Sequence, residues 1–309
     1  MLGAFWDAVG GKLADRAAAV SLPALVFWLA GLAAWLSHHH GPDSLTAYTG
    51  WLDQQRVFVQ AVVVVTVLLA VAASAVLVRQ AATPLLRFLE GYWPAFADPL
   101  RRRLADRLAA RAARDQQAWQ DAYARVHPPA VPTVDELAAY TRLERRRRRR
   151  PTQAGYFLPT PIGNILRAAE RRPLDKYGLD TVICWPRLWP ALPDTVRADL
   201  LAARAALDTA ATTTVWALLY CAFAPLALWA VPLGLAVAAL TVTVVIPARA
   251  QVFGELIEAA FDTHRATLYT RLRWPLPTHP RDEHEYGRHL TAYLWRGSDD
   301  TTPTFTPPP

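Results

Sequence analysis

The amino-acid sequence predicts an all-α membrane protein, with four transmembrane helices as two hairpins and a mainly helical cytoplasmic domain. Three stretches of the 309-residue chain are long, apolar and free of charge. The segments between them show helical periodicity and capping signals. Of the 33 Lys and Arg residues, 23 lie between the second and third stretches. With 53% hydrophobic residues and two cysteines, the composition excludes a disordered tail protein and a disulfide scaffold.

The first predicted hairpin covers residues 17–78. Its spans are Ala17–Ser37 (17–37), with 21 uncharged residues, and Val57–Val78 (57–78), with 22. About 20 residues at ~1.5 Å each cover the ~30 Å hydrocarbon core of a bilayer. A cleavable signal peptide explains the first stretch less well, because the stretch is too long and no small-x-small cleavage site follows it. Residues 1–16 place apolar side chains on one helical face, which predicts an interfacial amphipathic helix.

The second predicted hairpin covers residues 209–248, which are 40 residues without charge. One straight helix of that length would reach about 60 Å, about twice the thickness of the hydrocarbon core. We therefore predict two spans, Thr209–Trp229 (209–229) and Val231–Ala248 (231–248), joined by a tight turn. One long kinked helix and a re-entrant pair are the alternatives, because Pro225 and Pro232 weaken helical hydrogen bonding in either case.

The distribution of basic residues predicts the topology. Four spans place every Lys and Arg except Arg56 on one side, whereas three spans would move the seven that follow the last stretch to the other side. Because basic residues favour the cytoplasmic side, we predict a multi-pass protein of the inner (plasma) membrane with both termini cytoplasmic. The spans hold no Asp, Glu, Lys, Arg or His, which counts against a proton-coupled carrier or a pump.

Small residues recur at four-residue spacing in two of the spans. Ala230, Gly234 and Ala238 form one row, and Ala70 and Ser74 form another. Such rows let helix backbones approach closely. They predict helix packing, either between copies of the chain or within the chain's own bundle.

The predicted cytoplasmic domain, residues 79–208, carries a net charge of +9. Asp98 and Pro99 start one helix, which bears an apolar stripe from Leu100 onwards. Thr133 and Glu136 form a capping box that starts a second helix. This second helix runs into six consecutive arginines: Arg145, Arg146, Arg147, Arg148, Arg149 and Arg150.

The arginine run has several interpretations. It can bind anionic lipid headgroups, enforce topology, or be solvated without a ligand. A protein partner is a further alternative. Nucleic acid is the least favoured, because no nucleic-acid-binding fold or regular aromatic interleaving accompanies the run.

A segment rich in tryptophan and proline follows the run. Thr160 and Pro161 open a helix, and Thr181–Trp185 has the composition of a short strand. Trp185, Arg187 and Trp189 form either an aromatic wedge against the membrane or a partner, or part of a local core.

After the last span, residues 249–298 begin with an amphipathic helix. Its apolar stripe starts at Val252 and ends at Leu272. We expect that face to meet either the middle domain or another copy of the chain. The Pro- and Thr-rich residues 299–309 are expected to be disordered.

Three stretches outside the spans carry a family resemblance. They are Leu158–Glu170, Tyr177–Leu192 and Val252–Gly297, the last of which contains RWPLP and LTAYLWRG. In these stretches, about a quarter of the chain, the sequence resembles an uncharacterised family of bacterial multi-pass integral membrane proteins. The resemblance implies the four-helix membrane architecture and no activity.

No catalytic, cofactor or metal site is predicted. His284 and His289 are five residues apart and so point about 140° apart on a helix, which does not match a zinc-protease helix. His38, His39 and His40 with Asp43 are more typical of a solvated loop than of a metal site.

We therefore expect a non-enzymatic membrane anchor or scaffold that presents a basic cytoplasmic module. Its expected partners are the lipid bilayer, anionic lipids, an unidentified protein and a second copy of the chain. The alternative is a homo-oligomeric ion channel or pore with the cytoplasmic domain as its gate.

Overall fold

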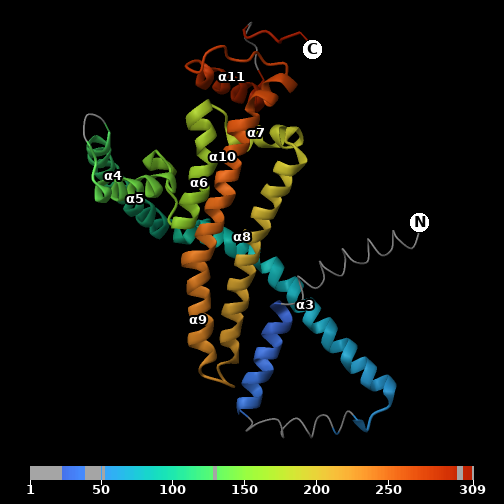
Figure 1. Ribbon diagram of the computed structural model, residues 1–309. Coiled ribbons are helices and arrows are strands. Elements are labelled where there is room, and N and C mark those ends of the chain that lie inside the picture. Colours follow the sequence, from blue (N-terminus) through green and yellow to red (C-terminus); the bar gives the residue numbers. More distant parts are fainter. Residues whose placement is uncertain (1–22, 39–49, 51–52, 128–130, 298–301, 308–309) are drawn as a thin grey trace. The chain divides into compact units, whose positions relative to one another are not determined.

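The computed structural model describes residues 23–38, 50, 53–127, 131–297 and 302–307 (Figure 1). All regular secondary structure in these ranges is helical. The chain divides into two compact units, residues 1–86 with 208–246 and residues 87–207 with 247–309. The predicted interfacial helix at residues 1–16 and the first residues of the predicted span 17–37 lie outside the described ranges.

Two of the described helices are long and apolar enough to cross a membrane. One begins with α3 (Val57–Glu90) and the other with α9 (Ala230–Leu240). Only 11% and 28% of their most apolar windows are buried, far less than in the core helix of a soluble protein. A third helix, Pro23–His38, is apolar but shorter. By length and composition these two helices could span a membrane, and the four-span topology stays a prediction.

Residues 208–246 fold as a helical hairpin rather than as one long helix. α8 (Asp194–Tyr220) ends before a 3-10 turn, Cys221–Phe223, and α9 starts at Ala230. The hydroxyl groups of Thr214 and Thr241 lie 2.8 Å apart between the two arms.

The turn of this hairpin is wider and starts earlier than the sequence predicted. The expected span 209–229 loses its α-helical structure after Tyr220. Pro225 has no N–H to donate and disfavours helix in the residue before it. Pro232 is accommodated because it lies in the first turn of α9, where N–H groups have no helical partner.

The small-residue row of α9 packs against α8 of the same chain. Ala230, Gly234 and Ala238 are all buried. A Cβ atom at Gly234 would lie 2.5 Å from the carbonyl oxygen of Ala217. The row is therefore used within the chain's own hairpin.

The predicted row on α3 lies one position away from the stripe that is buried. Ala70 is exposed and Ser74 is half-buried, whereas Val71, Ala75 and Val78 are buried. Ser74 accepts a hydrogen bond from Nε1 of Trp28 at 3.1 Å. The buried stripe of α3 therefore contains the larger side chains of Val71 and Val78 as well as the small Ala75.

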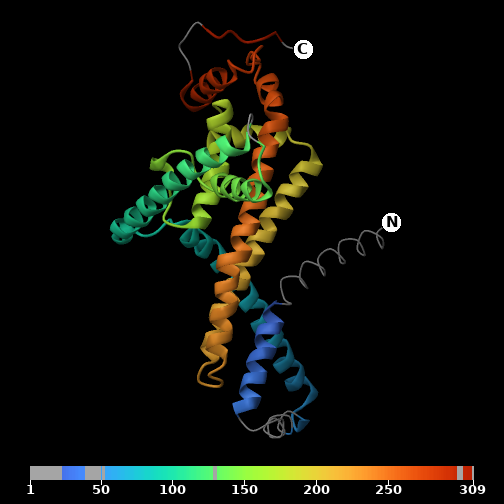
Figure 2. The same cartoon turned by 60° about the vertical axis from the view of Figure 1, so that its left-hand side comes forward.

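The second unit contains α4 (Asp98–Val126), α5 (Val134–Arg148), α6 (Pro161–Tyr177), α7 (Thr181–Leu188), the first half of α8, α10 (Ile246–Arg271) and α11 (Glu283–Arg296). Figures 1 and 2 both show α4 and α5 as an antiparallel pair. The capping box of Thr133 and Glu136 is formed, as the sequence predicted. The expected strand at Thr181–Trp185 is wrong. The segment is helical, because the carboxylate of Asp180 caps the first turn of α7 by accepting from the N–H groups of Val182 and Ile183.

The apolar face of α10 packs against the middle domain of the same chain. This was one of the two expected contacts, the other being a second copy of the chain. Phe261, Leu268 and Tyr269 of α10 share a core with Leu188 of α7 and Leu290 of α11. Residues 249–298 therefore do not form a region separate from residues 79–208. Both belong mainly to the second unit.

The tail also departs from the expected disorder over its described part, residues 302–307. Thr306 donates its N–H to the carbonyl oxygen of Arg273 at 2.9 Å, and Nε of Arg273 donates to the Thr306 carbonyl oxygen at 3.0 Å. The ring of Phe305 lies 6.3 Å from that of Trp274. Backbone pairing and an aromatic anchor order this segment despite its composition.

Glycines set the crossing of α6 and α11. Gly178 ends α6 with a φ of +70°, a conformation that side chains other than glycine rarely adopt. A Cβ atom on Gly287 of α11 would overlap the carbonyl group of Tyr177. The end of α6 and the middle of α11 are thus in backbone contact.

Candidate functional site

The six arginines at the end of α5 do not form a uniform charged surface. The guanidinium group of Arg147 lies over the ring of Trp119, 4.1 Å from its centre. Arg149 donates to the side chain of Gln251 at 2.6 Å, and Arg150 donates to Asp115 at 2.6 Å. Arg148 lies 3.5 Å from Glu144. Three of the six side chains, those of Arg147, Arg149 and Arg150, therefore hold the end of α5 against its neighbours, whereas Arg148 pairs within α5.

Arg145 and Arg146 are the two members of the run that stay free of such contacts within the described part of the chain. Both side chains are exposed. The predicted contact of the six-residue run with lipid or a partner stays a prediction.

The predicted aromatic wedge lies against the core of the second unit. Trp185 and Trp189 are half-buried, their rings lie 5.7 Å apart, and Trp185 lies 5.9 Å from the ring of Phe261. Arg187 is exposed and donates to the carbonyl oxygen of Ile183 in its own helix. The interpretation as a local core is the one that matches this placement.

A row of arginines on α4 was missed by the sequence analysis. At 100° per residue, Arg103, Arg107, Arg111 and Arg114 fall within about 80° on one helical face. All four are exposed, and none makes a side-chain ion pair or hydrogen bond to any other residue that the structure describes. We call these four residues the α4 arginine row. Their spacing of four, four and three residues was the available signal, which the more conspicuous run on α5 obscured.

Exposed apolar side chains lie just before the α4 arginine row. Phe96 is 86% exposed and Leu100, at the start of α4, is 54% exposed. Phe88 and Tyr92, near the end of α3, are also more than half exposed. The apolar stripe expected along α4 is therefore not buried at its first residue. Large aromatic groups beside uncompensated cations are typical of surfaces that contact the membrane interface.

A hollow of about 400 Å³ lies beside the α4 arginine row. Arg107, Arg111 and Arg114 line it together with apolar residues, among them Leu104, Leu108, Pro159 and Pro161. The arginines are charged at every physiological pH. A ligand with an anionic group and an apolar part fits this chemistry.

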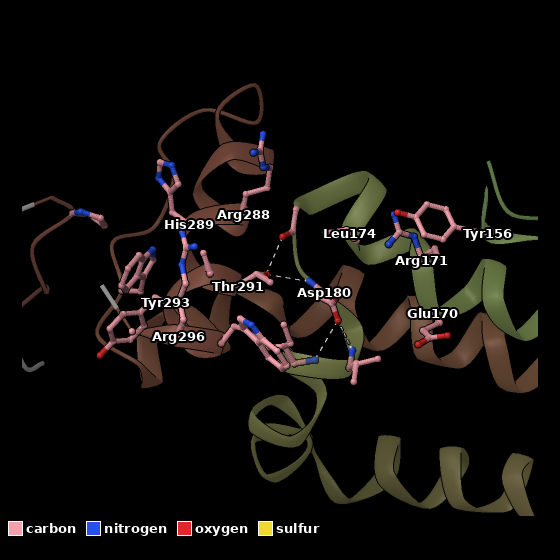
Figure 3. Close-up of a pocket in the computed structure, with 18 of the residues that line it drawn as sticks. Tyr156, Glu170, Arg171, Leu174, Asp180, Arg288, His289, Thr291, Tyr293 and Arg296 are labelled. Atoms are coloured by element: carbon pink, nitrogen blue, oxygen red, sulfur yellow. Dashed lines mark hydrogen bonds between the residues drawn. The ribbon is translucent and has the colours of Figure 1, made fainter. Parts of the chain in front are cut away.

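A larger groove of about 1410 Å³ also lies within the second unit (Figure 3). α6, the start of α7, α11 and Pro303 of the tail line it. Figure 3 shows Arg288, His289 and Arg296 on the α11 side, and Arg171 with Tyr156 at the other end. The guanidinium group of Arg171 lies 3.6 Å from the centre of the Tyr156 ring.

The carboxylates of this groove already have partners. Glu170 pairs with Arg167 at 3.1 Å, and Asp180 caps α7. Arg288 and Arg296, by contrast, are exposed and have no side-chain partner among the described residues. The groups left open to a ligand are therefore cations and donors.

An ion-pair network holds α6 to α10 on another side of the second unit. Glu258 pairs with Arg172 and, at 2.6 Å, with Lys176. Tyr177 donates to Asp262 at 2.6 Å. Burial opposes ionisation of Glu258, but the hydrogen bonds and charges of Lys176 and Arg172 outweigh it and lower the pKa of the carboxyl group. All donors and acceptors here are paired, which is typical of a structural role.

The described residues do not bring together a metal-binding set. No three His, Cys, Asp or Glu side chains within them approach closely enough to hold a metal ion. His39, His40 and Asp43 of the predicted solvated loop lie outside the described residues. Burial raises the pKa of the Cys184 thiol to about 11, which keeps it protonated and unreactive at neutral pH.

Comparison with known proteins adds no family or fold assignment. No family model, no curated protein and no solved structure matches the chain.

Proposed function

We propose that the protein is a non-enzymatic anchor in the bacterial inner membrane whose basic second unit binds anionic lipid headgroups at the cytoplasmic face. The observation that carries this proposal is the α4 arginine row, because its four cations are exposed and unpaired within the described part of the chain. A basic residue near an anionic membrane contributes about 1 kcal/mol of attraction. Four unpaired arginines therefore attract the protein to an anionic membrane. Arginines that already pair with protein groups do not contribute in this way.

The order of the chain supports a position of this row near the membrane. Phe96 lies only 18 residues after Val78, the end of the predicted span 57–78. The proposal gives Phe96 and Leu100 the role of interfacial anchors and gives the arginines the role of phosphate contacts. The hollow between the row and Pro159 provides room for a headgroup.

The proposed topology rests on the charge distribution and on the two apolar helices. Both termini and the second unit lie on the cytoplasmic side, and the resemblance to bacterial multi-pass membrane proteins supports the same arrangement.

Two features that could join copies of the chain in a pore make contacts within one chain. The small-residue row of α9 packs on α8, and the apolar face of α10 packs on α7 and α11 of the same chain. Size measurement in detergent with light scattering tests the pore alternative directly. A monomer or dimer that leaves liposomes tight to ions agrees with the anchor, and a defined ring of copies that conducts ions contradicts it.

Hydrogen–deuterium exchange in nanodiscs tests the lipid contact. We expect peptides from residues 96–114 to exchange more slowly in discs that contain phosphatidylglycerol than in discs of phosphatidylcholine alone. Peptides from residues 283–296, in α11, are the internal comparison and are expected to exchange equally in both. Equal exchange of residues 96–114 in the two lipids would contradict the proposal.

A further inference from the structure

The groove between α6 and α11 is lined by other residues than the α4 arginine row. Its charges and hydrogen-bond donors indicate a second ligand. Four arginines line it, namely Arg167, Arg171, Arg288 and Arg296, against two carboxylates, Glu170 and Asp180. Both carboxylates are engaged, Glu170 by Arg167 and Asp180 by the backbone of α7. Arg167 pairs with Glu170 and Arg171 pairs with Asp175 at 3.9 Å, whereas Arg288 and Arg296 have no counter-charge among the described residues. The four arginines outnumber the two carboxylates of the lining, so the electrostatic field inside the groove is positive.

The unmet hydrogen-bonding groups of the groove are donors. Nε1 of Trp274 and Nε of Arg171 are buried without an acceptor among the described residues, and Trp274 is only 4% exposed. The hydroxyl of Thr291 is already used, since it donates to the Gly178 carbonyl oxygen and accepts from the Asp180 N–H. Buried donors without a partner are costly, and an acceptor-rich ligand at the groove wall would relieve that cost.

The cations lie at two separate places in the groove. Figure 3 shows Arg171 over Tyr156 at one end and Arg288 and Arg296 on the α11 side. A volume of about 1410 Å³ exceeds what one phosphate group fills. The geometry points to an elongated ligand with more than one anionic group.

We propose that this groove binds a small molecule that carries two or more phosphate groups. The flat fork of a guanidinium group matches two oxygens of a phosphate, which favours arginine over lysine at such sites. Arg288 and Arg296 hold one phosphate group and Arg171 holds another, while Tyr156 keeps the Arg171 guanidinium in place by stacking. The residues are distinct from the α4 arginine row, so the inference stands whether or not that row binds lipid.

Calorimetric titration of the full-length protein in detergent with inorganic tripolyphosphate tests the site. The variant Arg288→Gln/Arg296→Gln removes two exposed side chains that have no described partner, so its fold is expected to be intact. We expect its affinity to fall about 10-fold or more, and we expect a similar loss for Arg171→Gln at the other end. The matched control is Arg145→Gln/Arg146→Gln, which removes the same charge from an exposed place outside the groove and is expected to change the affinity less than 2-fold.

A second arm distinguishes a soluble ligand from a lipid headgroup. The same variants are compared in nanodiscs that contain cardiolipin, which carries two phosphate groups. Loss of affinity confined to tripolyphosphate supports a soluble ligand, and loss confined to cardiolipin supports a lipid source of the same chemistry. The proposal is overturned if neither ligand responds to the groove variants, or if the control variant weakens binding as much as they do.

Discussion

The guanidinium group of Arg150 donates a hydrogen bond to Asp115 at 2.6 Å, and this pair links the end of the arginine run to α4. Both side chains are about one-quarter to one-third exposed, so the pair is partly shielded from water. Arginines that look equivalent in the sequence therefore differ in the structure. Arg150 holds two elements together, whereas Arg145 is exposed to solvent.

The first prediction compares these two roles. Arg150→Gln is expected to destabilise the protein by about 1 kcal/mol, because it leaves Asp115 without its partner, whereas Arg145→Gln is expected to change stability by less than about 0.5 kcal/mol. Thermal unfolding of the full-length protein in one detergent measures both. Equal effects of the two substitutions would mean that the run acts only through its total charge.

The second prediction concerns the backbone contact between α6 and α11. Gly287→Ala is expected to cost about 1–3 kcal/mol, because the added Cβ overlaps the Tyr177 carbonyl group and forces the helices apart. Gly155→Ala is the control, because a Cβ there meets no atom within 4 Å. A Gly287→Ala protein as stable as the control would show that the two helices do not cross at this point.

The third prediction concerns the α8–α9 hairpin. Replacing Thr241 by Val removes its hydrogen bond with Thr214 and is expected to destabilise the hairpin by roughly 0.6–1.7 kcal/mol. The double variant Thr214→Val/Thr241→Val is expected to cost less than the sum of the two single variants, since the hydroxyl groups act as a pair. Strictly additive losses would contradict contact between α8 and α9 at this level.

The fourth prediction is a pH dependence. The pKa of Glu258 is lower in the folded protein than in the unfolded chain, so the unfolded chain binds more protons there and the stabilisation is present above the unfolded pKa. That stabilisation is lost as the pH falls below about 4.5 and through the folded pKa. Unfolding midpoints measured from pH 7 to pH 3 are expected to fall less steeply for Glu258→Gln than for the unmodified protein. Parallel curves would show that Glu258 is not paired.

Local signals made part of this fold predictable. The capping box at Thr133 and the helix start at Thr160–Pro161 both formed, because these signals act on residues adjacent in the chain. The hairpin at 209–248 was also predicted, since 40 uncharged residues exceed one crossing of a bilayer.

Features that depend on distant partners were not predictable. From the sequence, Trp185 could belong to a short strand, to an aromatic wedge or to a local core. Its place in a core depends on Phe261 of α10, which is far away in the sequence. The separate uses of Arg145 and Arg150 depend on Asp115, which lies 35 residues away. The α4 arginine row could have been found from spacing alone, whereas the groove at Arg288 needed α6 and α11 to be brought together.

The central claim is that the α4 arginine row contacts anionic lipid, and a spin label at Phe96 tests it most directly. The label is placed in a background without Cys184 and Cys221, and its depth is measured in proteoliposomes by oxygen accessibility. The account predicts insertion below the headgroups with phosphatidylglycerol. It also predicts a shallower position with Arg107→Gln/Arg111→Gln, while Arg145→Gln/Arg146→Gln has little effect. A label that stays in water in every lipid, or that responds equally to both double variants, would contradict the account.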